Sequence, residues 1–389
     1  MKSTNKILLI IVVSQFCCTS LWFSGNAIIT DLADAFQLAD GALGHLTSAV
    51  QFGFIIGTLV FAVLTIADRF SPSKVFFISA ITAALCNLGS ILDSNNLTSL
   101  LIFRFLTGFF LAGIYPVGMK IAADYFQKGL GKSLGFLVGA LVLGTAFPHL
   151  LKNVTDQFPW RIVVIITSGV ATIGGLLMLL GVPNGPYRKS NKSPNFKAFF
   201  KVFKNRNFRS AAFGYFGHMW ELYAFWAFVP IMLRTYVKLY PHTSFNIPLL
   251  SFIIIALGSF ACIIGGYVSQ TFGTKKTAAL ALTMSCLCCL LSPLFFYINS
   301  SALFIGFLIF WGLVVIADSP LFSTMVAQNA VAENKGTALT IVNCIGFSIT
   351  IISIQLINNL NEVLDPKYIY TILAIGPILG LIALKKIKP

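Results

Sequence analysis

Charged residues are scarce in this chain of 389 residues, of which only 10% are Asp, Glu, Lys or Arg. Soluble domains carry about 25% charged residues, so this scarcity excludes an ordinary soluble protein and indicates one that crosses a membrane many times. Acidic residues are the scarcer kind, 12 against 27 basic ones. The basic residues are not gathered in a soluble domain, and we therefore expect no nucleic-acid partner.

Motifs for metal binding, disulfide bonds and enzyme catalysis are also absent. The eight cysteines lie in apolar runs, without a Cys-x-x-Cys pair or a histidine at ligand spacing, which argues against disulfides and a metal site. The sequence has no phosphate-binding glycine loop, no zinc-type His/Glu helix and no serine-nucleophile elbow. We expect neither an enzyme nor a bound cofactor.

Long apolar runs make up most of the chain, of which 57% is hydrophobic. Runs of about 20 residues are long enough to cross a bilayer as helices. The first run shows no small-residue cleavage site, so we expect it to remain as a helix and not to be a signal peptide. The sequence predicts an all-α membrane protein with twelve transmembrane helices, approximately at 7–29, 43–66, 75–93, 98–122, 132–151, 161–182, 209–233, 247–270, 276–297, 301–326, 336–359 and 368–384.

The distribution of basic residues predicts that the N and C termini are both cytoplasmic. With that orientation, 21 of the 27 lysine and arginine residues lie on the inner side, 5 lie on the outer side, and Arg104 lies within a span. We expect a monomer that passes many times through the inner (plasma) membrane of a bacterium.

The segment 183–208 separates an N-terminal six-helix bundle, residues 1–182, from a C-terminal six-helix bundle, residues 209–389. Phenylalanines recur in it at helical spacing beside lysines, which predicts a basic amphipathic helix lying on anionic lipid at the inner leaflet. A regulatory or partner-binding role is the alternative. The residues concerned are Phe196, Phe199, Phe200, Phe203, Lys197, Lys201 and Lys204.

Landmarks of the first half recur in the second half at a nearly constant distance along the chain. This regularity predicts duplication of a six-span unit, and parallel repeats of that kind place the substrate between the halves near the bilayer midplane. The aligned pairs are Asp68 with Gln270 and Lys74 with Lys276 at an offset of 202, Tyr115-Pro116 with Ser319-Pro320 at 204, and Gly131 with Gly336 at 205.

At these positions the chain resembles the major facilitator superfamily, whose loop signature after the second helix is G-x-L-x-D-R-x-G-R-K. Asp68 and Arg69 match this signature, although Leu64 and residues 71–73 replace its glycines and basic pair. The second copy keeps Gly266, Gly273, Lys275 and Lys276 but has Gln270 in place of the acid.

The arginine-glycine signature of the family's fourth helix is matched by Arg104, Gly108 and Gly113. The resemblance covers the whole chain. It implies a fold of two helical bundles with alternating access, in which the Asp68/Arg69 loop gates the inner side.

Arg104 is the charged residue that most needs an explanation. Placing a guanidinium at membrane depth costs roughly 2.5–3.5 kcal/mol. On a helix, Arg104, Gly108, Leu111 and Tyr115 share one face, which we interpret as the wall of a polar cavity. A structural arginine bonded to carbonyls of neighbouring helices is the alternative. The substrate-binding candidates are Arg104, Tyr115, Trp220, Asn26, Gln51 and Asn343.

Two carboxylates lie within predicted spans, and such residues are functional by default. Glu221 has His218 three residues earlier on the same helix face, so the two are expected to handle the coupling proton. A Glu–His bond that only satisfies two polar groups is the alternative. Asp318 directly precedes Ser319-Pro320, and it either caps the helix interrupted there or takes part in coupling.

These features predict a secondary active transporter powered by a proton gradient, with no other cofactor. We expect import by symport of a small organic anion, because a carboxylate can bind the Arg104 guanidinium through two hydrogen bonds. A proton-coupled efflux antiporter for an amphipathic or cationic compound is the first alternative. A transporter-like membrane receptor or sensor is the alternative from another class.

Overall fold

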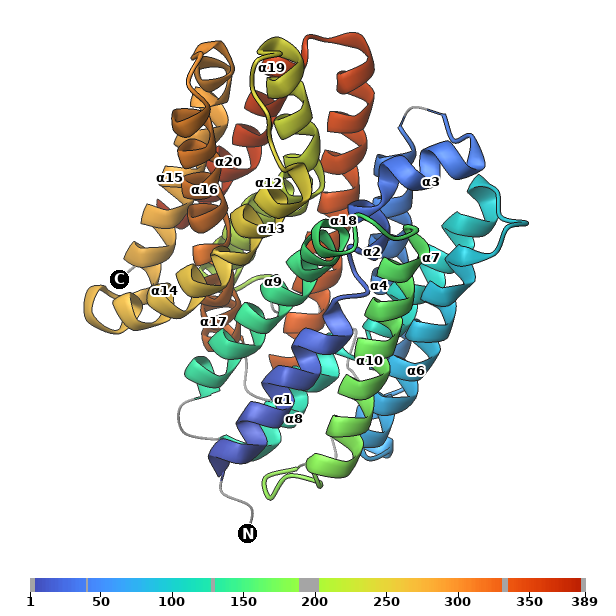
Figure 1. Ribbon diagram of the computed structural model, residues 1–389. Coiled ribbons are helices and arrows are strands. Elements are labelled where there is room, and N and C mark those ends of the chain that lie inside the picture. The colour runs from blue at the N-terminus through green and yellow to red at the C-terminus, as the bar shows by residue number, and fades with distance from the viewer. Residues whose placement is uncertain (1–3, 40, 127–129, 189–202, 331–334, 386–389) are drawn as a thin grey trace. The chain divides into compact units, whose positions relative to one another are not determined.

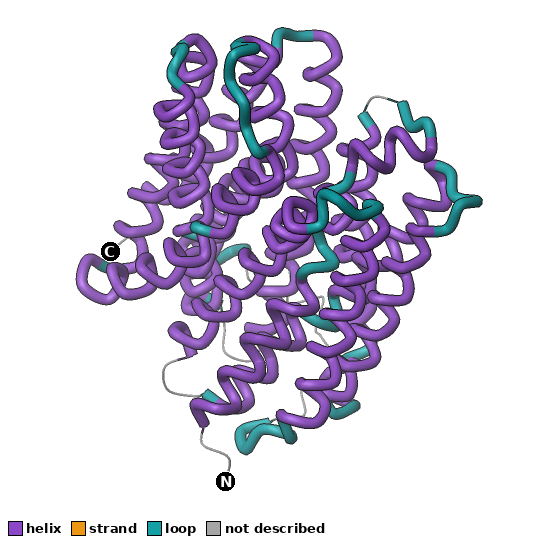
Figure 2. Tube along the Cα trace, viewed as in Figure 1, coloured by secondary structure: helices purple, strands orange, loops and turns teal. Residues whose placement is uncertain are grey.

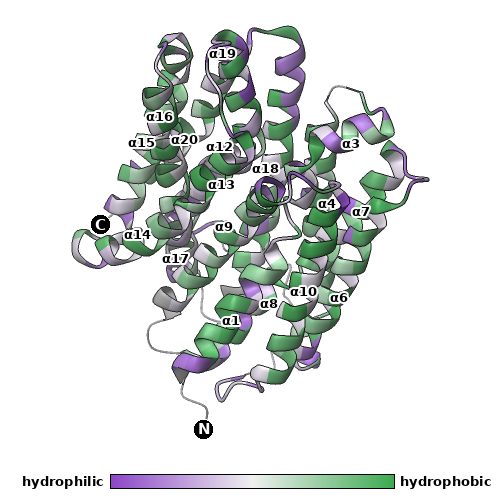
Figure 3. Ribbon diagram, viewed as in Figure 1, coloured by the Kyte–Doolittle hydropathy of each residue, from purple (hydrophilic) through white to green (hydrophobic). Residues whose placement is uncertain are grey.

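The computed structural model describes residues 4–39, 41–126, 130–188, 203–330 and 335–385. Within these ranges the regular structure is entirely helical, and no strand occurs (Figure 2). Ten helical stretches of this part of the chain are long and apolar enough to cross a membrane, and hydrophobic residues dominate them in Figure 3. The fold is that of an all-α membrane protein. The predicted spans at 7–29 and 209–233 fall outside this set of ten.

The chain divides into two compact units, residues 1–194 and 195–389. In unit 1, α1 packs against α9 and α10, and α4 packs along α7 (Figure 1). Its helices are α1 (Thr4–Thr19), α2 (Ser24–Ala27), α3 (Ile29–Phe36), α4 (Ala42–Val63), α5 (Ile66–Arg69), α6 (Pro72–Leu88), η1 (Gly89–Ile91), α7 (Leu97–Leu111), α8 (Tyr115–Tyr125), α9 (Leu130–Val154) and α10 (Arg161–Gly181).

Unit 2 is organised around α12, which packs against α18 and α20. Polar residues in the middle of α12 distinguish it from the ten strongly apolar stretches. The helices of this unit are α12 (Arg206–Leu239), α13 (Ile247–Ala256), α14 (Gly258–Phe272), α15 (Thr274–Tyr297), α16 (Ser301–Ala317), α17 (Ser319–Asn329), α18 (Lys335–Val363), α19 (Pro366–Ile369), η3 (Tyr370–Ala374) and α20 (Ile375–Lys385).

The first predicted span is not one helix. Between α1 and α2 the backbone forms turns over residues 20–23, and a further turn residue, Ile28, separates α2 from α3. No proline or glycine lies in 20–23, so the sequence shows no local reason for this break. The carbonyl groups released there need other hydrogen-bond partners.

Two other spans are interrupted at matching places. Unit 1 has a break between α7 and α8, just before Tyr115-Pro116, and unit 2 has one between α16 and α17, just before Ser319-Pro320. Proline is favoured in the first turn of a helix because its missing N–H has no helical partner there, and so both prolines begin a new helix. The continuous helical face predicted from Arg104 to Tyr115 is therefore interrupted after Leu111.

Glycines allow a close helix contact that occurs in both units. A methyl group on Gly108 of α7 would lie 2.0 Å from the Val50 carbonyl oxygen of α4. A methyl group on Gly312 of α16 would lie 2.2 Å from the Ile254 carbonyl oxygen of α13. Both residues of the second contact follow those of the first by 204 positions. The two units thus share a packing contact as well as the position of their helix breaks.

The linker region is described only at its two ends. Its first residues bond to helices of unit 1: Ser73 Oγ donates to the Val182 carbonyl at 2.7 Å, Ser71 Oγ to the Asn184 amide oxygen at 2.9 Å, and the Tyr125 hydroxyl to the Pro183 carbonyl. Most of the predicted amphipathic helix, and with it the predicted contact with anionic lipid, lies outside the described residues. At the other end α12 begins at Arg206, within the segment predicted as linker.

The α4–α7 contact can be tested with Gly53→Ala. The added methyl group would lie 1.9 Å from the Phe105 carbonyl oxygen, so the two backbones must separate. We expect a loss of about 1–3 kcal/mol in stability, as for other overpacked cores, measured as a lower midpoint of thermal unfolding in detergent. The control is Gly169→Ala on α10, where a methyl group meets nothing within 4 Å. Equal midpoints for the two variants would contradict the close contact.

Candidate functional site

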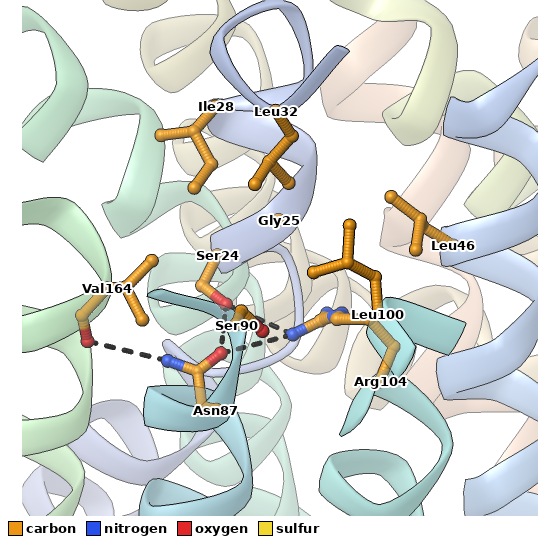
Figure 4. Close-up of a pocket in the computed structure, with 10 residues that line it drawn as sticks. All are labelled: Ser24, Gly25, Ile28, Leu32, Leu46, Asn87, Ser90, Leu100, Arg104 and Val164. Atoms are coloured by element: carbon orange, nitrogen blue, oxygen red, sulfur yellow. Dashed lines mark hydrogen bonds between the residues drawn. The ribbon is translucent and has the colours of Figure 1, made fainter. Parts of the chain in front are cut away.

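The Arg104 side chain is buried inside unit 1 and is directed at the break between α1 and α2. Its Nη1 donates to the Leu21 carbonyl oxygen at 3.1 Å and to Ser24 Oγ at 3.1 Å, and its Nη2 donates to the Trp22 carbonyl oxygen. Nη1 also donates to Asn87 Oδ1 of α6 at 3.2 Å (Figure 4). The guanidinium therefore binds the carbonyl groups that the break releases.

Asn87 extends this network to a fourth helix. Its Oδ1 also accepts from Ser24 Oγ at 2.6 Å, and its Nδ2 donates to Ser168 Oγ of α10 at 3.0 Å and to Thr167 Oγ1 at 3.3 Å. All these partners of Arg104 and Asn87 are neutral. Among the residues that the structure describes, no carboxylate forms an ion pair with Arg104.

A cavity of about 10 Å³, on the scale of a single water molecule, adjoins the guanidinium. Arg104 Nε and Ser90 Oγ border it, and each lacks a hydrogen-bond partner. Ser24, Gly25 and Asn87 also line the cavity, together with five apolar side chains (Figure 4). The apolar side chains are Ile28, Leu32, Leu46, Leu100 and Val164.

These contacts are those of the alternative interpretation, a structural arginine bonded to carbonyls of neighbouring elements. Gly108, which the sequence placed with Arg104 on the wall of a polar cavity, instead packs directly against the backbone of α4 at Val50. Substrate binding by Arg104 therefore stays a prediction, and its geometry in unit 1 favours a role in holding the first span.

Glu221 is the centre of a second buried cluster, in unit 2. Its Oε1 accepts from Trp311 Nε1 of α16 at 2.6 Å, and its Oε2 accepts from Ser285 Oγ of α15 at 2.9 Å. Ser285 Oγ also lies 3.2 Å from the Leu282 carbonyl oxygen, to which it can donate instead. Glu221 is 1% exposed, and none of the described lysines or arginines forms an ion pair with it.

His218 and Asp318 form a separate pair. His218 Nδ1 of α12 lies 2.8 Å from Asp318 Oδ1, and each residue is 1% exposed. The rings of Tyr215 and Phe322 lie near the imidazole, with their centroids 6.0 and 6.1 Å from its centroid. The sequence paired His218 with Glu221, whereas the structure gives each a different partner, because both cross-helix contacts reach elements distant in the sequence.

Asp318 stands directly before α17, where the sequence offered a capping role. Its side chain makes no capping hydrogen bond, and only its backbone carbonyl accepts from Phe322 N, at 2.9 Å. The structural alternative of a side-chain cap is therefore wrong, because the carboxylate turns to His218. Neither Asp318 oxygen nor His218 Nε2 has a hydrogen-bond partner, so the 2.8 Å approach of His218 Nδ1 to Asp318 Oδ1 is an ion-pair contact.

The predicted gating loop has an ion pair in its first copy. Asp68 of α5 lies 2.6 Å from Lys120 Nζ of α8, and Arg188 donates to the backbone carbonyls of Asp68 and Phe70. Arg69 is exposed. In the second copy, Gln270 is exposed at the end of α14, and Gly273 turns the chain with a φ of 86°. Among the described residues, no ion pair corresponds there to the Asp68–Lys120 pair of the first copy. Gly266, Lys275 and Lys276 lie on the same α14–α15 hairpin.

The remaining predicted substrate ligands lie in different surroundings. Asn26 Nδ2 donates to Thr47 Oγ1 at 2.8 Å, and Trp220 Nε1 donates to the Ile372 carbonyl oxygen at 3.2 Å. Gln51 is fully buried, and neither end of its amide has a partner. Tyr115 begins α8 and Asn343 lies on α18, both half-buried.

Sequence reasoning missed several neutral partners in these clusters, among them Ser24, Asn87, Thr167, Ser168, Ser285 and Trp311. Each is a polar side chain inside an apolar run, which is a usable but weak signal. Within the described ranges, no three His, Cys, Asp or Glu side chains gather as a possible metal site.

The sequence and the fold of this chain were both compared with those of known proteins. The sequence profile of one protein family, the Major Facilitator Superfamily, matches residues 11–354. The structure aligns with a bacterial homologue of the human lysosomal transporter Spinster, in an inward-facing and unoccupied conformation, at a TM-score of 0.72 and 14% identity over 99% of this chain and 96% of that chain. It aligns with the human organic anion transporter MFSD10 (TETRAN) at a TM-score of 0.74 and 12% identity, over 99% and 100%.

Two curated relatives match part of the chain. An uncharacterized transporter of Buchnera aphidicola subsp. Schizaphis graminum is 24% identical over 187 residues, which are 47% of this chain and 44% of the relative. The niacin transporter NiaP of Acinetobacter baylyi is 31% identical over 202 residues, 45% of this chain and 43% of the relative. The matched part thus spans less than half of each relative.

The structural role of Arg104 can be tested with Arg104→Gln. Loss of hydrogen bonds from a charged donor typically costs about 1.5–3 kcal/mol; here the Trp22 carbonyl would lose its bond to Arg104, and the Leu21 carbonyl would keep only the bond from Ser24 Oγ. We expect a lower thermal unfolding midpoint. The control is Arg161→Gln, which removes a partly exposed ion pair with Asp93, worth at most about 1 kcal/mol. Wild-type stability of Arg104→Gln would instead favour a guanidinium reserved for a ligand.

Proposed function

Because the chain belongs to the Major Facilitator Superfamily, we propose that it is a proton-coupled symporter that imports a small organic anion. The family and the fold make the chain a multi-pass membrane transporter. Proton coupling, the direction of transport, the class of substrate and a place in a bacterial inner membrane belong to the proposal.

The surroundings of Glu221 are the observation that carries it. An ionised Glu221 accepts one hydrogen bond from Trp311 and one from Ser285. A protonated Glu221 can donate from Oε2 to Ser285 Oγ, whose own hydrogen then turns to the Leu282 carbonyl oxygen at 3.2 Å. The Trp311 bond to Oε1 persists in both states.

Glu221 therefore keeps a hydrogen bond on each of its two carboxyl oxygens with or without its proton. A structural carboxylate in an apolar bundle would be expected beside a cation, which the described residues do not provide. A site that satisfies both protonation states suits a group that gains and loses a proton in each transport cycle.

The His218–Asp318 pair is a second proton-handling group in the proposal. A pair that holds one proton between the imidazole and the carboxylate is neutral overall, which suits its complete burial. Asp318 also lies at the break between α16 and α17, so a change in its protonation would act where that span is interrupted.

An organic anion as the substrate is supported by the relative from Acinetobacter baylyi, which is named for niacin transport. Physical chemistry makes the proton partner useful for such a substrate. An interior-negative membrane potential opposes the entry of each negative charge by about 2.3 kcal/mol per 100 mV. A proton carried with a monovalent anion cancels this opposition and adds the pH gradient as a driving force.

The proton site can be tested with Glu221→Gln in proteoliposomes that carry an inwardly directed proton gradient. Gln keeps the size of the side chain but cannot be protonated, so gradient-driven accumulation of nicotinate or another organic anion should be lost. Exchange of internal for external substrate needs no net proton movement and should persist. Loss of both activities would contradict a specific proton role. Expulsion of substrate by the wild type under this gradient would favour the efflux antiporter.

Trp311→Phe tests the bond that favours ionised Glu221. The indole N–H can only donate, and a charge-assisted hydrogen bond is stronger than a neutral one, so its removal should keep Glu221 protonated to a higher pH. We expect the external pH of half-maximal uptake to rise. The control is Tyr236→Phe, which removes a buried hydrogen bond to the Ile298 carbonyl and should leave the profile in place. A profile that falls in Trp311→Phe, or shifts equally in both, would contradict the assignment.

A further inference from the structure

Gln51 of α4 is a buried amide without hydrogen bonds. Its side chain is 0% exposed, and neither Nε2 nor Oε1 has a partner. Leaving a buried polar group unpaired typically costs about 1–3 kcal/mol, and an amide has both a donor and an acceptor to satisfy. A partner that arrives from outside the chain explains why such a group is kept.

The neighbours of Gln51 lie along one stripe of α4. Thr47, Gln51 and Phe54 recur at helical spacing, so they share a face. On one side of Gln51, Thr47 Oγ1 accepts from Asn26 of α2; on the other, the ring of Phe54 lies 4.9 Å from that of Trp22. Gln51 thus faces the interrupted first span, between an amide and a pair of aromatic rings.

We propose that Gln51, Asn26 and the Trp22–Phe54 ring pair form a subsite for a planar aromatic acid or its carboxamide, a detail that rests on the proposed transport function. A carboxamide or a protonated carboxyl group satisfies both ends of the Gln51 amide together: its carbonyl oxygen accepts from Nε2, and its N–H or O–H donates to Oε1. The two rings supply an aromatic surface for the flat part of the molecule.

The subsite lies within unit 1 and differs from the Arg104 cluster. Arg104 is bonded to carbonyl groups of the break itself, whereas the Gln51 amide is left unpaired. The ligand class follows from this difference. The described neighbours of the Gln51 amide, Thr47, Asn26 and the two rings, are all neutral, so a group bound there is best buried as a neutral acid or amide and not as a bare carboxylate.

Gln15 provides a matched control in the same unit. It is also fully buried with both ends of its amide unpaired. Its surroundings differ, because its Oε1 lies close to Gly118 of α8, where a methyl group would come within 2.3 Å of it. No described ring pair or second amide flanks it in the way that Trp22–Phe54 and Asn26 flank Gln51.

The experiment measures binding of nicotinate, nicotinamide and acetate to the purified full-length protein by calorimetry. The wild type should bind the two ring compounds at least tenfold more tightly than acetate. Gln51→Leu should weaken both ring compounds at least tenfold, while its unfolding midpoint without ligand equals or exceeds that of the wild type. Gln15→Leu should change neither affinity by more than twofold. If Gln51→Leu does not fold, Gln51→Met replaces it.

Unchanged affinity in the Gln51 variants, equal binding of acetate, or no binding of either ring compound to the wild type would overturn the subsite. These outcomes are separable from failure of the proposed function. Proton-driven uptake of acetate or lactate without binding of the ring compounds would keep the symporter and remove the subsite. Binding of nicotinamide that depends on Gln51, without proton-driven uptake of any anion, would keep the subsite and remove the symporter.

Discussion

The packing of unit 1 depends on the hydrogen bonds between the Arg104 guanidinium and the carbonyl groups at the break in the first span. The turn between α1 and α2 releases the carbonyl groups of Leu21 and Trp22 at a depth where water does not replace a lost partner. A guanidinium at the same depth needs acceptors. Each would be unfavourable alone, and together they fix the positions of α2, α6, α7 and α10 through Asn87 and Ser24.

The two units share their packing but not their chemistry. The Gly108–Val50 and Gly312–Ile254 contacts and the two helix breaks before proline occur at matching positions. The polar clusters do not follow this pattern, since the cluster in unit 1 surrounds a cation, Arg104, with neutral groups, whereas those in unit 2 contain two acids, Glu221 and Asp318. Counting back 202 residues from Glu221 leads to Thr19, whose hydroxyl bonds only to backbone carbonyls. Duplication would therefore have kept the scaffold while each copy acquired its own polar residues.

The sequence was informative wherever the controlling physics is local. Apolar length identified ten of the twelve predicted spans as helices in the described part of the chain, and the interruption near Pro320 could be predicted because proline disrupts a helix through its own ring and missing N–H. The break at residues 20–23 could not be predicted, because Arg104, which bonds to the carbonyl groups of Leu21 and Trp22, lies more than 80 residues away in the sequence. For the same reason the spacing on α12 placed His218 beside Glu221, whereas contacts with Asp318, Trp311 and Ser285 decide their actual partners.

Glu221 in unit 2 and Gln51 in unit 1 also differ in whether their side chains have hydrogen-bond partners. A transporter needs polar groups of both kinds, with partners and without. Glu221 has partners for its ionised and its protonated form, so neither state is trapped by a missing hydrogen bond. Gln51 has no partner, so a ligand that supplies one gains free energy that the empty protein lacks. A proton site should hold its proton only weakly, since the proton must be released on the other side of the membrane. A recognition site gains selectivity from being left unsatisfied, because a molecule that lacks the matching donor or acceptor cannot recover that free energy.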